Sequence, residues 1–165
     1  MTKNPYLKIK KLHPNAKLPI KAYDTDLGYD LYCLEHTIVK AGEVTLVNTG
    51  IACNFPEGYG AIIRDRSSIA TKKGIFVVAG IIDEAYTGEM LVAFQNPIRH
   101  KLIYNDDGLL IASQSGVYPV NITFEAGDKI AQMILVPTVN FHILEVSELE
   151  ETERGALGFG SSGAR

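Results

Sequence analysis

Short apolar runs separated by turn residues extend over most of this 165-residue chain, and apolar residues at helical spacing are almost absent. Runs of this length, bounded by Gly, Pro, Asn and Asp, are typical of β-strands. We expect strands at residues 6–10, 28–33, 43–55, 60–63, 75–82, 121–124, 130–136 and 141–146. This pattern predicts an all-β barrel or sandwich. A short-helix signal lies at 64–74, where Ser67 or Ser68 would cap a single turn and Gly74 would end it.

The stretch from Val77 to Val92 is predicted to form a strand, a turn and a second strand. The apolar run at 75–82 lacks polar alternation, which is expected for a strand buried on both faces. Gly80 interrupts this run and indicates a bulge or a close approach to the backbone. Asp83 ends the run, and Tyr86 and Gly88 follow. An aspartate in this place is either a turn residue that bonds its own backbone or a functional carboxylate.

Two segments differ from the rest of the chain. Residues 98–120 contain short apolar runs around Asp106-Asp107-Gly108, which is a strong hairpin signal. The end of the chain, RGALGFGSSGAR, is rich in glycine and serine around a single aromatic residue. By composition it is flexible and cannot pack as a regular element.

Composition limits the class of protein. Apolar residues make up 46% and charged residues 21% of the chain, as in an ordinary globular protein. The length fits one domain, expected at 1–150 and followed by a flexible tail at 151–165. The net charge of −3 argues against sequence-independent binding to nucleic acid. Because the N-terminus lacks an apolar signal core and no apolar run could span a bilayer, we expect a soluble cytoplasmic protein without membrane contact.

The cysteines and histidines are not spaced like metal ligands. Cys33 and Cys53 lie far apart among apolar residues, so they are expected to be reduced thiols of the core. The four histidines are scattered along the chain, so no protein-ligated zinc site is expected.

Three polar groups stand out against this apolar background. A basic turn could bind phosphate through its arginines, serines and backbone N–H groups, although it could also be a solvated loop. It comprises Arg64, Arg66, Ser67, Ser68, Lys72 and Lys73. The second group is Gln132, which interrupts an apolar strand but could simply face solvent. In the tail, Arg154, Ser161 and Ser162 could bind a polyphosphate while Phe159 stacks on a base; a linker is the alternative.

Five stretches, in order along the chain, resemble the motifs of the trimeric dUTPases, the deoxyuridine triphosphate nucleotidohydrolases. They are AYDTDLGYDLYC, RDRSSIATKKG, AGIIDEAYTGE, GDKIAQMI and RGALGFGSSG. The resemblance implies a jelly-roll-like distorted barrel and a homotrimer with active sites at the subunit interfaces. It implies Mg²⁺-dependent hydrolysis of dUTP to dUMP and pyrophosphate, which lowers dUTP and supplies dUMP for thymidylate synthesis. A virus-encoded member would act inside the host cell.

The resemblance also implies roles for individual residues. Asp83 is the expected general base for the water that attacks the α-phosphorus. Backbone groups of Gly80, Ile81 and Ile82 are expected to read uracil, and Tyr86 to pack beneath the deoxyribose. The expected phosphate ligands are Arg66, Ser67, Ser68 and Gln132, while Phe159 would cap the uracil and Arg154, Gly160, Ser161 and Ser162 would close as a lid over a neighbouring active site.

Asp30 is expected to be a structural residue behind these ligands, because a buried carboxylate that supports a loop is the commoner arrangement. Mg²⁺ would be bound through phosphate oxygens and water, with no direct protein ligand.

The chain departs from the family pattern at several positions. Asp65 and Ser68 replace a proline and a glycine of the second motif, and Leu157 replaces a glycine in the tail. Asp26 and Leu27 replace Ser-Ala in the first motif. An aspartate beside a phosphate site is expected to point away or to pair with an arginine. The hairpin at 98–120 is predicted to be an insertion, either a surface excursion or an arm that binds a protein partner.

The sequence leaves two alternative functions open. A dCTP deaminase, or a bifunctional deaminase and dUTPase, shares the fold but carries a glutamate near the position of Ala93. A nucleotide-sensing regulatory protein would instead use the arm at 98–120 to bind its partner.

Overall fold

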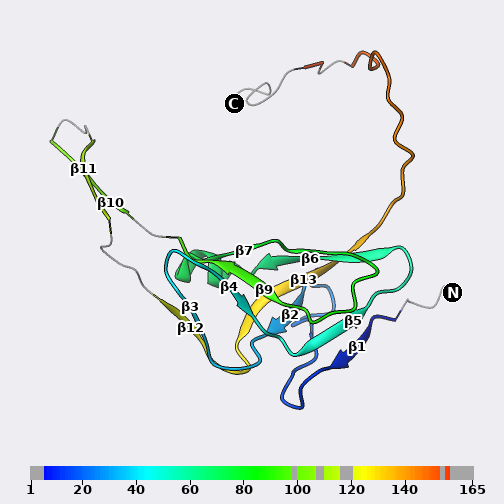
Figure 1. Ribbon diagram of the computed structural model, residues 1–165, viewed down its shortest axis with the longest axis horizontal. Helices are drawn as coiled ribbons and strands as arrows, with labels where there is room; N and C mark the ends of the chain where they lie inside the picture. The colour runs from blue at the N-terminus through cyan, green and yellow to red at the C-terminus, as the bar shows by residue number, and fades with distance from the viewer. Residues whose placement is uncertain (1–5, 98–99, 107–109, 116–120, 153–154, 157–165) are drawn as a thin grey trace.

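The computed structural model describes residues 6–97, 100–106, 110–115, 121–152 and 155–156. Figure 1 shows a β-rich body from which a hairpin and the C-terminal segment extend. The strands of the body are β1 (Lys8–Lys11), β2 (Tyr29–Tyr32), β3 (Thr37–Val39), β4 (Val44–Val47), β5 (Ile51–Asn54), β6 (Tyr59–Asp65), β7 (Phe76–Val78), β8 (Ile81–Ile82), β9 (Val92–Gln95), β12 (Ile122–Phe124) and β13 (Lys129–Pro137). A short helix, η1 (Ile69–Lys73), follows β6. The prediction of an all-β fold is therefore confirmed.

The body is made of antiparallel sheets that share one core. A four-stranded sheet has the order β2-β13-β6-β8, a three-stranded sheet has the order β4-β9-β7, and the pairs β1–β5 and β3–β12 complete the body. β13 is the longest strand and pairs with β2 on one side and with β6 on the other. Side chains of both larger sheets and of β12 meet in the core, where the ring centroids of Phe94 on β9 and Phe124 on β12 lie 5.3 Å apart.

Gly50 bends the chain as its position in the sequence predicted. The expected strand at 43–55 is divided at this glycine into β4 and β5, which belong to different sheets. Gly50 has a φ of 69°, in the left-handed region that favours glycine. An added Cβ there would also lie 2.9 Å from the Leu34 side chain.

The expected strand at 75–82 is wrong in its continuity and in its burial. Ala79, with a φ of 53°, and Gly80 break it into β7 and β8, which belong to different sheets. β7 pairs with β9, so the predicted order of strand, turn and strand is confirmed for these two strands. β8, in contrast, pairs with β6. Phe76 and Ile81 are 42% and 78% exposed, because each strand has only one face on the core of this single chain.

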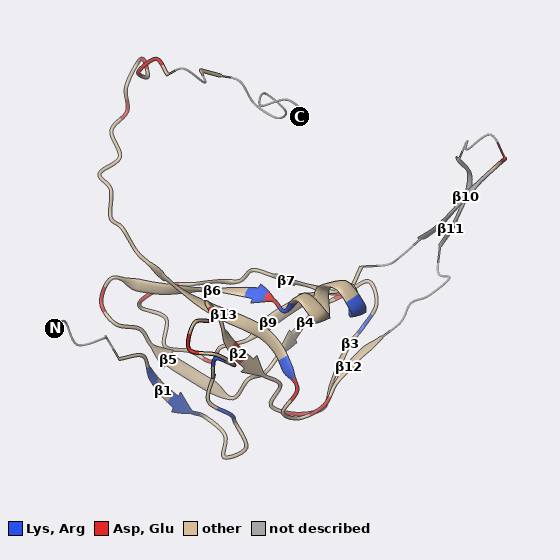
Figure 2. Cartoon of the chain, turned by 180° about the vertical axis from the view of Figure 1, so that it is seen from behind, with Lys and Arg blue, Asp and Glu red and all other residues tan. Residues whose placement is uncertain are grey.

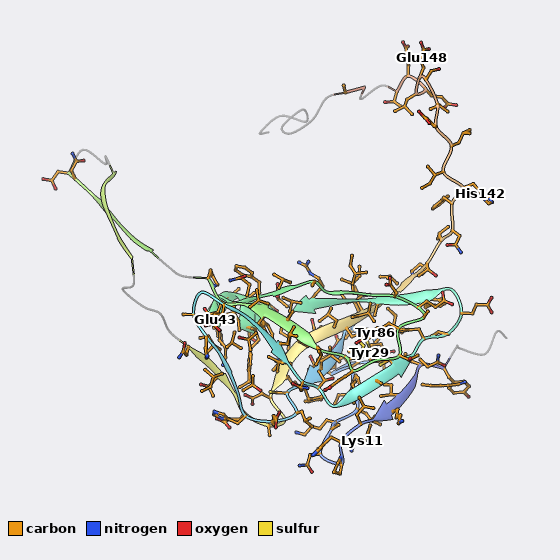
Figure 3. All side chains as sticks on the ribbon, in the orientation of Figure 1. Lys11, Tyr29, Glu43, Tyr86, His142 and Glu148 are labelled. Atoms are coloured by element: carbon orange, nitrogen blue, oxygen red, sulfur yellow. The ribbon has the colours of Figure 1, made fainter. Side chains whose placement is uncertain are left out.

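The hairpin predicted around Asp106 is confirmed, and the predicted strand at 141–146 is wrong. β10 (His100–Tyr104) pairs with β11 (Leu110–Ser115), and Figure 1 shows this hairpin standing away from the body. Residues 138–152 form neither helix nor strand and run outward from the end of β13. Figure 3 shows His142 and Glu148 on this C-terminal segment, far from the body. Its apolar side chains are exposed because no strand of the described chain lies beside it to pair with.

Both cysteines are free thiols buried in the core, as predicted. Burial raises the pKa of the Cys53 thiol to about 11, and it also raises the pKa of the Cys33 thiol. No helix in the described ranges is long and apolar enough to cross a membrane.

Candidate active site

β8 and the turn after it place Asp83 at the edge of an open hollow. Ile81 and Ile82 pair with Ile62 and Ala61 of β6, and the amide of Tyr86 closes the turn by donating to the Asp83 carbonyl at 3.0 Å. The hollow has a volume of about 210 Å³ and is lined by Ile81, Ile82, Asp83, Tyr86, Glu89 and Leu91. Asp83 is exposed, so its carboxylate is accessible to a ligand or a water molecule.

Gly80 packs directly against β6. The amide of Ile63 donates to the Gly80 carbonyl at 2.7 Å, and a Cβ added at Gly80 would lie 2.3 Å from the Ile63 carbonyl oxygen. The close approach predicted for this glycine is therefore confirmed. Since a side chain would push β8 away from β6, the glycine fixes where the backbone of Ile81 and Ile82 lies.

Tyr86 lies over Gly88 in the loop that leads to β9, and Figure 3 labels it within the body. Its hydroxyl donates to the Glu89 carbonyl at 2.9 Å, and a Cβ on Gly88 would lie 2.5 Å from the Tyr86 hydroxyl oxygen. The Glu89 carboxylate accepts hydrogen bonds from the amide of Gly50 at 2.8 Å and from the side chain of Asn48 at 3.1 Å. These contacts attach the aromatic ring to the bend between β4 and β5.

A second cluster surrounds the buried carboxylate of Asp30 on β2. Asp30 pairs with the Arg66 guanidinium at 3.1 Å and with the Lys129 ammonium at 2.7 Å. The Gln132 amide also donates to Asp30, at 3.5 Å, and Arg66 donates to the Lys129 carbonyl at 3.3 Å. The hydrogen bond to Asp30 raises the pKa of Lys129. Because two cations share one carboxylate, the cluster has an excess positive charge suited to an anion.

The helix η1 begins three residues after Arg66. The amides of Ile69 and Ala70 donate to the Arg66 carbonyl at 2.9 and 3.0 Å, and Gly74, with a φ of 64°, ends the helix by donating to the Ile69 carbonyl at 3.1 Å. Ser68 is the N-cap residue, as predicted, but its side chain makes no cap hydrogen bond. Ser67 and Ser68 are both exposed.

Asp65 points away from this turn. Its carboxylate accepts a hydrogen bond from the backbone amide of Val77 on β7. Asp65, which replaces the usual proline, therefore links β6 to β7 and does not direct its negative charge toward the basic residues. Figure 2 marks those basic residues in blue at the end of β6 and in η1.

The two clusters lie at opposite ends of β6. Ile82 is opposite Ala61, near the start of the strand, whereas Arg66 follows its last residue. A β-strand rises about 3.3 Å per residue, so roughly 15–20 Å of strand separates Asp83 from Arg66. One chain thus brings Asp83, Tyr86 and the backbone at 80–82 together, and separately brings Asp30, Arg66 and Gln132 together.

Five predicted site residues, Arg154, Phe159, Gly160, Ser161 and Ser162, lie outside the described residues. Leu157 lies outside them as well. Lys129 and Glu84 were not predicted from the sequence, although each lies inside one of the five motifs that resemble those of the dUTPases. The available signal was a charged residue close to a predicted site residue, since Glu84 is next to Asp83 and Lys129 is three positions before Gln132.

Within the described part of the chain, no group of three or more His, Cys, Asp and Glu side chains is arranged to bind a metal ion.

Comparison with known proteins identifies the family. The family model described as dUTPase matches residues 14–112 and 117–163. The deoxyuridine 5′-triphosphate nucleotidohydrolase of Hydrogenobaculum sp. is 38% identical over 162 residues, covering 96% of this chain and 99% of that protein. The chain belongs to the dUTPase family, an enzyme family of the nucleotide hydrolases.

Solved structures agree with this assignment. A mutant dUTPase of Staphylococcus bacteriophage 80alpha with dUpNHpp is 30% identical with a TM-score of 0.79, and the match covers 98% of this chain and 99% of that one. A mutant dUTPase from phage phi11 of S. aureus, described for its coordination of a structural Mg(II) ion, is 26% identical with a TM-score of 0.71. That match covers 89% of this chain and 100% of the phage chain.

Proposed function

We propose that this protein hydrolyses dUTP to dUMP and pyrophosphate, with Asp83 as the general base. The observation that carries the proposal is the placement of an exposed carboxylate at the rim of a hollow formed by the backbone and side chains of β8. Asp83 takes a proton from water, the water oxygen bonds to the α-phosphorus, and pyrophosphate leaves. A general base in this role contributes about 10²–10⁴-fold to the rate.

The backbone at 80–82 recognises the base of the substrate. The edge of uracil presents an acceptor, a donor and an acceptor, which fixed peptide groups can match. Cytosine reverses part of this pattern and leaves buried groups unpaired, which can discriminate by roughly 10⁴-fold. Gly80 is central to this role because its contact with Ile63 fixes the position of the β8 backbone. The Tyr86 ring lies beneath the deoxyribose and excludes a 2′-hydroxyl.

The Asp30 cluster binds the triphosphate. Arg66 and Gln132, with the hydroxyls of Ser67 and Ser68, contact phosphate oxygens, and Asp30 supports them from behind. Arg154, Gly160, Ser161 and Ser162 close over the phosphates, and Phe159 caps the uracil.

We infer a homotrimer in which each active site combines two chains. One chain contributes Asp83, and its neighbour contributes Arg66, since the two lie at opposite ends of β6 in one chain. Exposed apolar side chains support association. They lie on the sheet β4-β9-β7 and on the C-terminal segment, and they include Val44, Leu46, Phe76, Phe141, Ile143 and Leu144.

Mg²⁺ would be held through the phosphate oxygens of the substrate and through water, with no direct protein ligand, since the ion usually keeps several waters beside substrate phosphates. Bound to the phosphate oxygens, it would neutralise charge on the triphosphate. The segment 98–120, which contains the hairpin β10–β11, remains predicted to be an insertion, either a surface excursion or an arm that binds a protein partner.

The test is hydrolysis of dUTP, dCTP, dTTP and UTP side by side, with and without Mg²⁺, by the wild type and by Asp83→Asn. We expect pyrophosphate release from dUTP but not from the other three nucleotides. This release should depend on Mg²⁺ and should be lost in Asp83→Asn. Equal hydrolysis of dCTP and dUTP, or full activity of Asp83→Asn, would refute the proposal. Analytical ultracentrifugation of the same samples measures the oligomeric state.

A further inference from the structure

Glu84, the residue after Asp83, connects three parts of the chain. Its carboxylate oxygen Oε2 accepts one hydrogen bond from the amide of Gly58 and another from the hydroxyl of Thr138, each at 3.1 Å. Gly58 lies in the turn between β5 and β6, and Thr138 directly follows β13. The amide of Thr138 in turn donates to the Gly58 carbonyl at 2.8 Å. The three residues therefore form a closed set of contacts.

The turn backbone is also packed against β6 at this point. A Cβ added at Gly60 would lie 2.8 Å from the Ile82 carbonyl oxygen and 3.7 Å from the Glu84 amide nitrogen. The chain from Ile82 to Glu84 thus lies close against β6 on one side, while the Glu84 side chain anchors it on the other.

Asp83 itself has no comparable support. Among the described residues, its carboxylate takes part in no hydrogen bond or ion pair, and the residue is exposed. The position of that carboxylate is therefore set by the turn backbone. Since Glu84 is a side-chain anchor of this turn and is the neighbour of Asp83, its contacts influence where the Asp83 oxygens lie.

Thr138 gives these contacts a second consequence. It directly follows β13, and Figure 1 shows the C-terminal segment leaving the body at the end of that strand. A hydrogen bond from its hydroxyl to Glu84 links the start of that segment to the turn that carries Asp83.

We propose that Glu84 is a positioning residue for Asp83 and that it couples the exit of the C-terminal segment to the placement of the base. This rests on the proposed role of Asp83 in dUTP hydrolysis. A displacement of about 1 Å can cost a reaction about 10²-fold, so loss of the anchor is expected to act on the chemical step more than on binding.

The experiment compares Glu84→Ala, Glu84→Gln and Thr138→Val with Glu57→Ala, an exposed glutamate in the turn that Glu84 contacts. Glu84→Ala is expected to lower kcat for dUTP about 10–100-fold, with KM and dUMP affinity changed less than about threefold. Glu84→Gln, which keeps an acceptor oxygen, is expected to retain most activity. Thr138→Val removes one donor and is expected to give an intermediate loss, and Glu57→Ala none.

Combining Glu84→Ala with Asp83→Asn distinguishes the positioning of Asp83 from a purely structural role of Glu84. Positioning predicts that Glu84→Ala causes no further loss of kcat in the Asp83→Asn background, because its effect passes through that carboxylate. An equal loss in both backgrounds would overturn the proposal, as would wild-type kcat in Glu84→Ala. Wild-type kcat in Thr138→Val would overturn the coupling to the C-terminal segment. A wild type that fails to hydrolyse dUTP would refute the proposed function instead.

Discussion

The amide nitrogen of Ile63 lies 2.7 Å from the carbonyl oxygen of Gly80, and no side chain could fit between these two residues. This contact fixes β8 on the edge of β6. It thereby determines where the backbone that would read uracil stands relative to Asp83. Changes at Gly80 should therefore affect stability and substrate binding together.

Gly80→Ala is expected to destabilise the fold by about 1–3 kcal/mol and to raise KM for dUTP, because the new Cβ would overlap the Ile63 carbonyl. Urea unfolding and steady-state kinetics measure both effects. Gly58→Ala is the matched control. Its Cβ would meet no atom within 4 Å, so it should lose only about 1 kcal/mol from its positive φ and keep KM nearer the wild-type value. Equal behaviour of the two variants would contradict this account.

Tyr86→Ala is expected to admit ribonucleotides. Removal of the ring should raise kcat/KM for UTP relative to dUTP by about tenfold or more, since the space for a 2′-hydroxyl would open. Tyr86→Phe loses only the hydrogen bond to the Glu89 carbonyl and should keep the discrimination. An unchanged ratio in Tyr86→Ala would show that the ring does not contact the sugar.

Asp30→Asn should weaken the triphosphate site. Two cations would lose their shared carboxylate, and because the Arg66 and Lys129 side chains are 29% and 36% exposed, water compensates in part. We expect a loss of about 1–3 kcal/mol in the free energy of unfolding, with a higher KM for dUTP and unchanged affinity for deoxyuridine. Asp24→Asn changes an exposed aspartate and is the control. A wild-type KM in Asp30→Asn would contradict the role of Asp30.

Stability should fall in alkaline solution because of the buried thiols. The pKa of Cys53 is about 11 in the folded chain, against an ordinary value of 9.0, so the folded state retains its proton where the unfolded state has lost it. The stability that the protonated Cys53 thiol gives the folded state is complete below pH 9. It is lost as the pH rises to about 11, by up to about 1.4 kcal/mol for each pH unit. Urea unfolding from pH 8 to 10.5 measures this slope. Cys53→Ala should make it shallower, and an identical slope would contradict the assignment.

Much of the fold could be predicted from the sequence, and the failures share a cause. Gly50 and Gly74 marked real ends of elements because their backbone angles suit glycine. The strand expected at 141–146 failed because its apolar residues have no neighbouring strand in one chain, and the burial expected for Ile81 failed for the same reason. An apolar pattern indicates that a residue favours burial, but it does not show which element would cover it.

Residues of the candidate site could be predicted from the sequence, but their arrangement in space could not. The motifs indicated Asp83, Arg66 and Gln132, but spacing along the chain could not reveal that Asp83 and Arg66 stand at opposite ends of β6. Nor could it reveal the partners of Glu84 and Lys129, since hydrogen bonds between distant strands depend on sheet register.

The most direct test of the proposed shared active site mixes two variants, Asp83→Asn and Arg66→Ala, that are each expected to be inactive. Each is refolded alone and then both are refolded together in equal amounts, and dUTP hydrolysis is measured. If Asp83 and Arg66 act from different chains, random mixing restores about one quarter of wild-type activity, because that share of interfaces combines two intact halves. No recovery above the separate variants, with trimers confirmed by ultracentrifugation, would contradict the account.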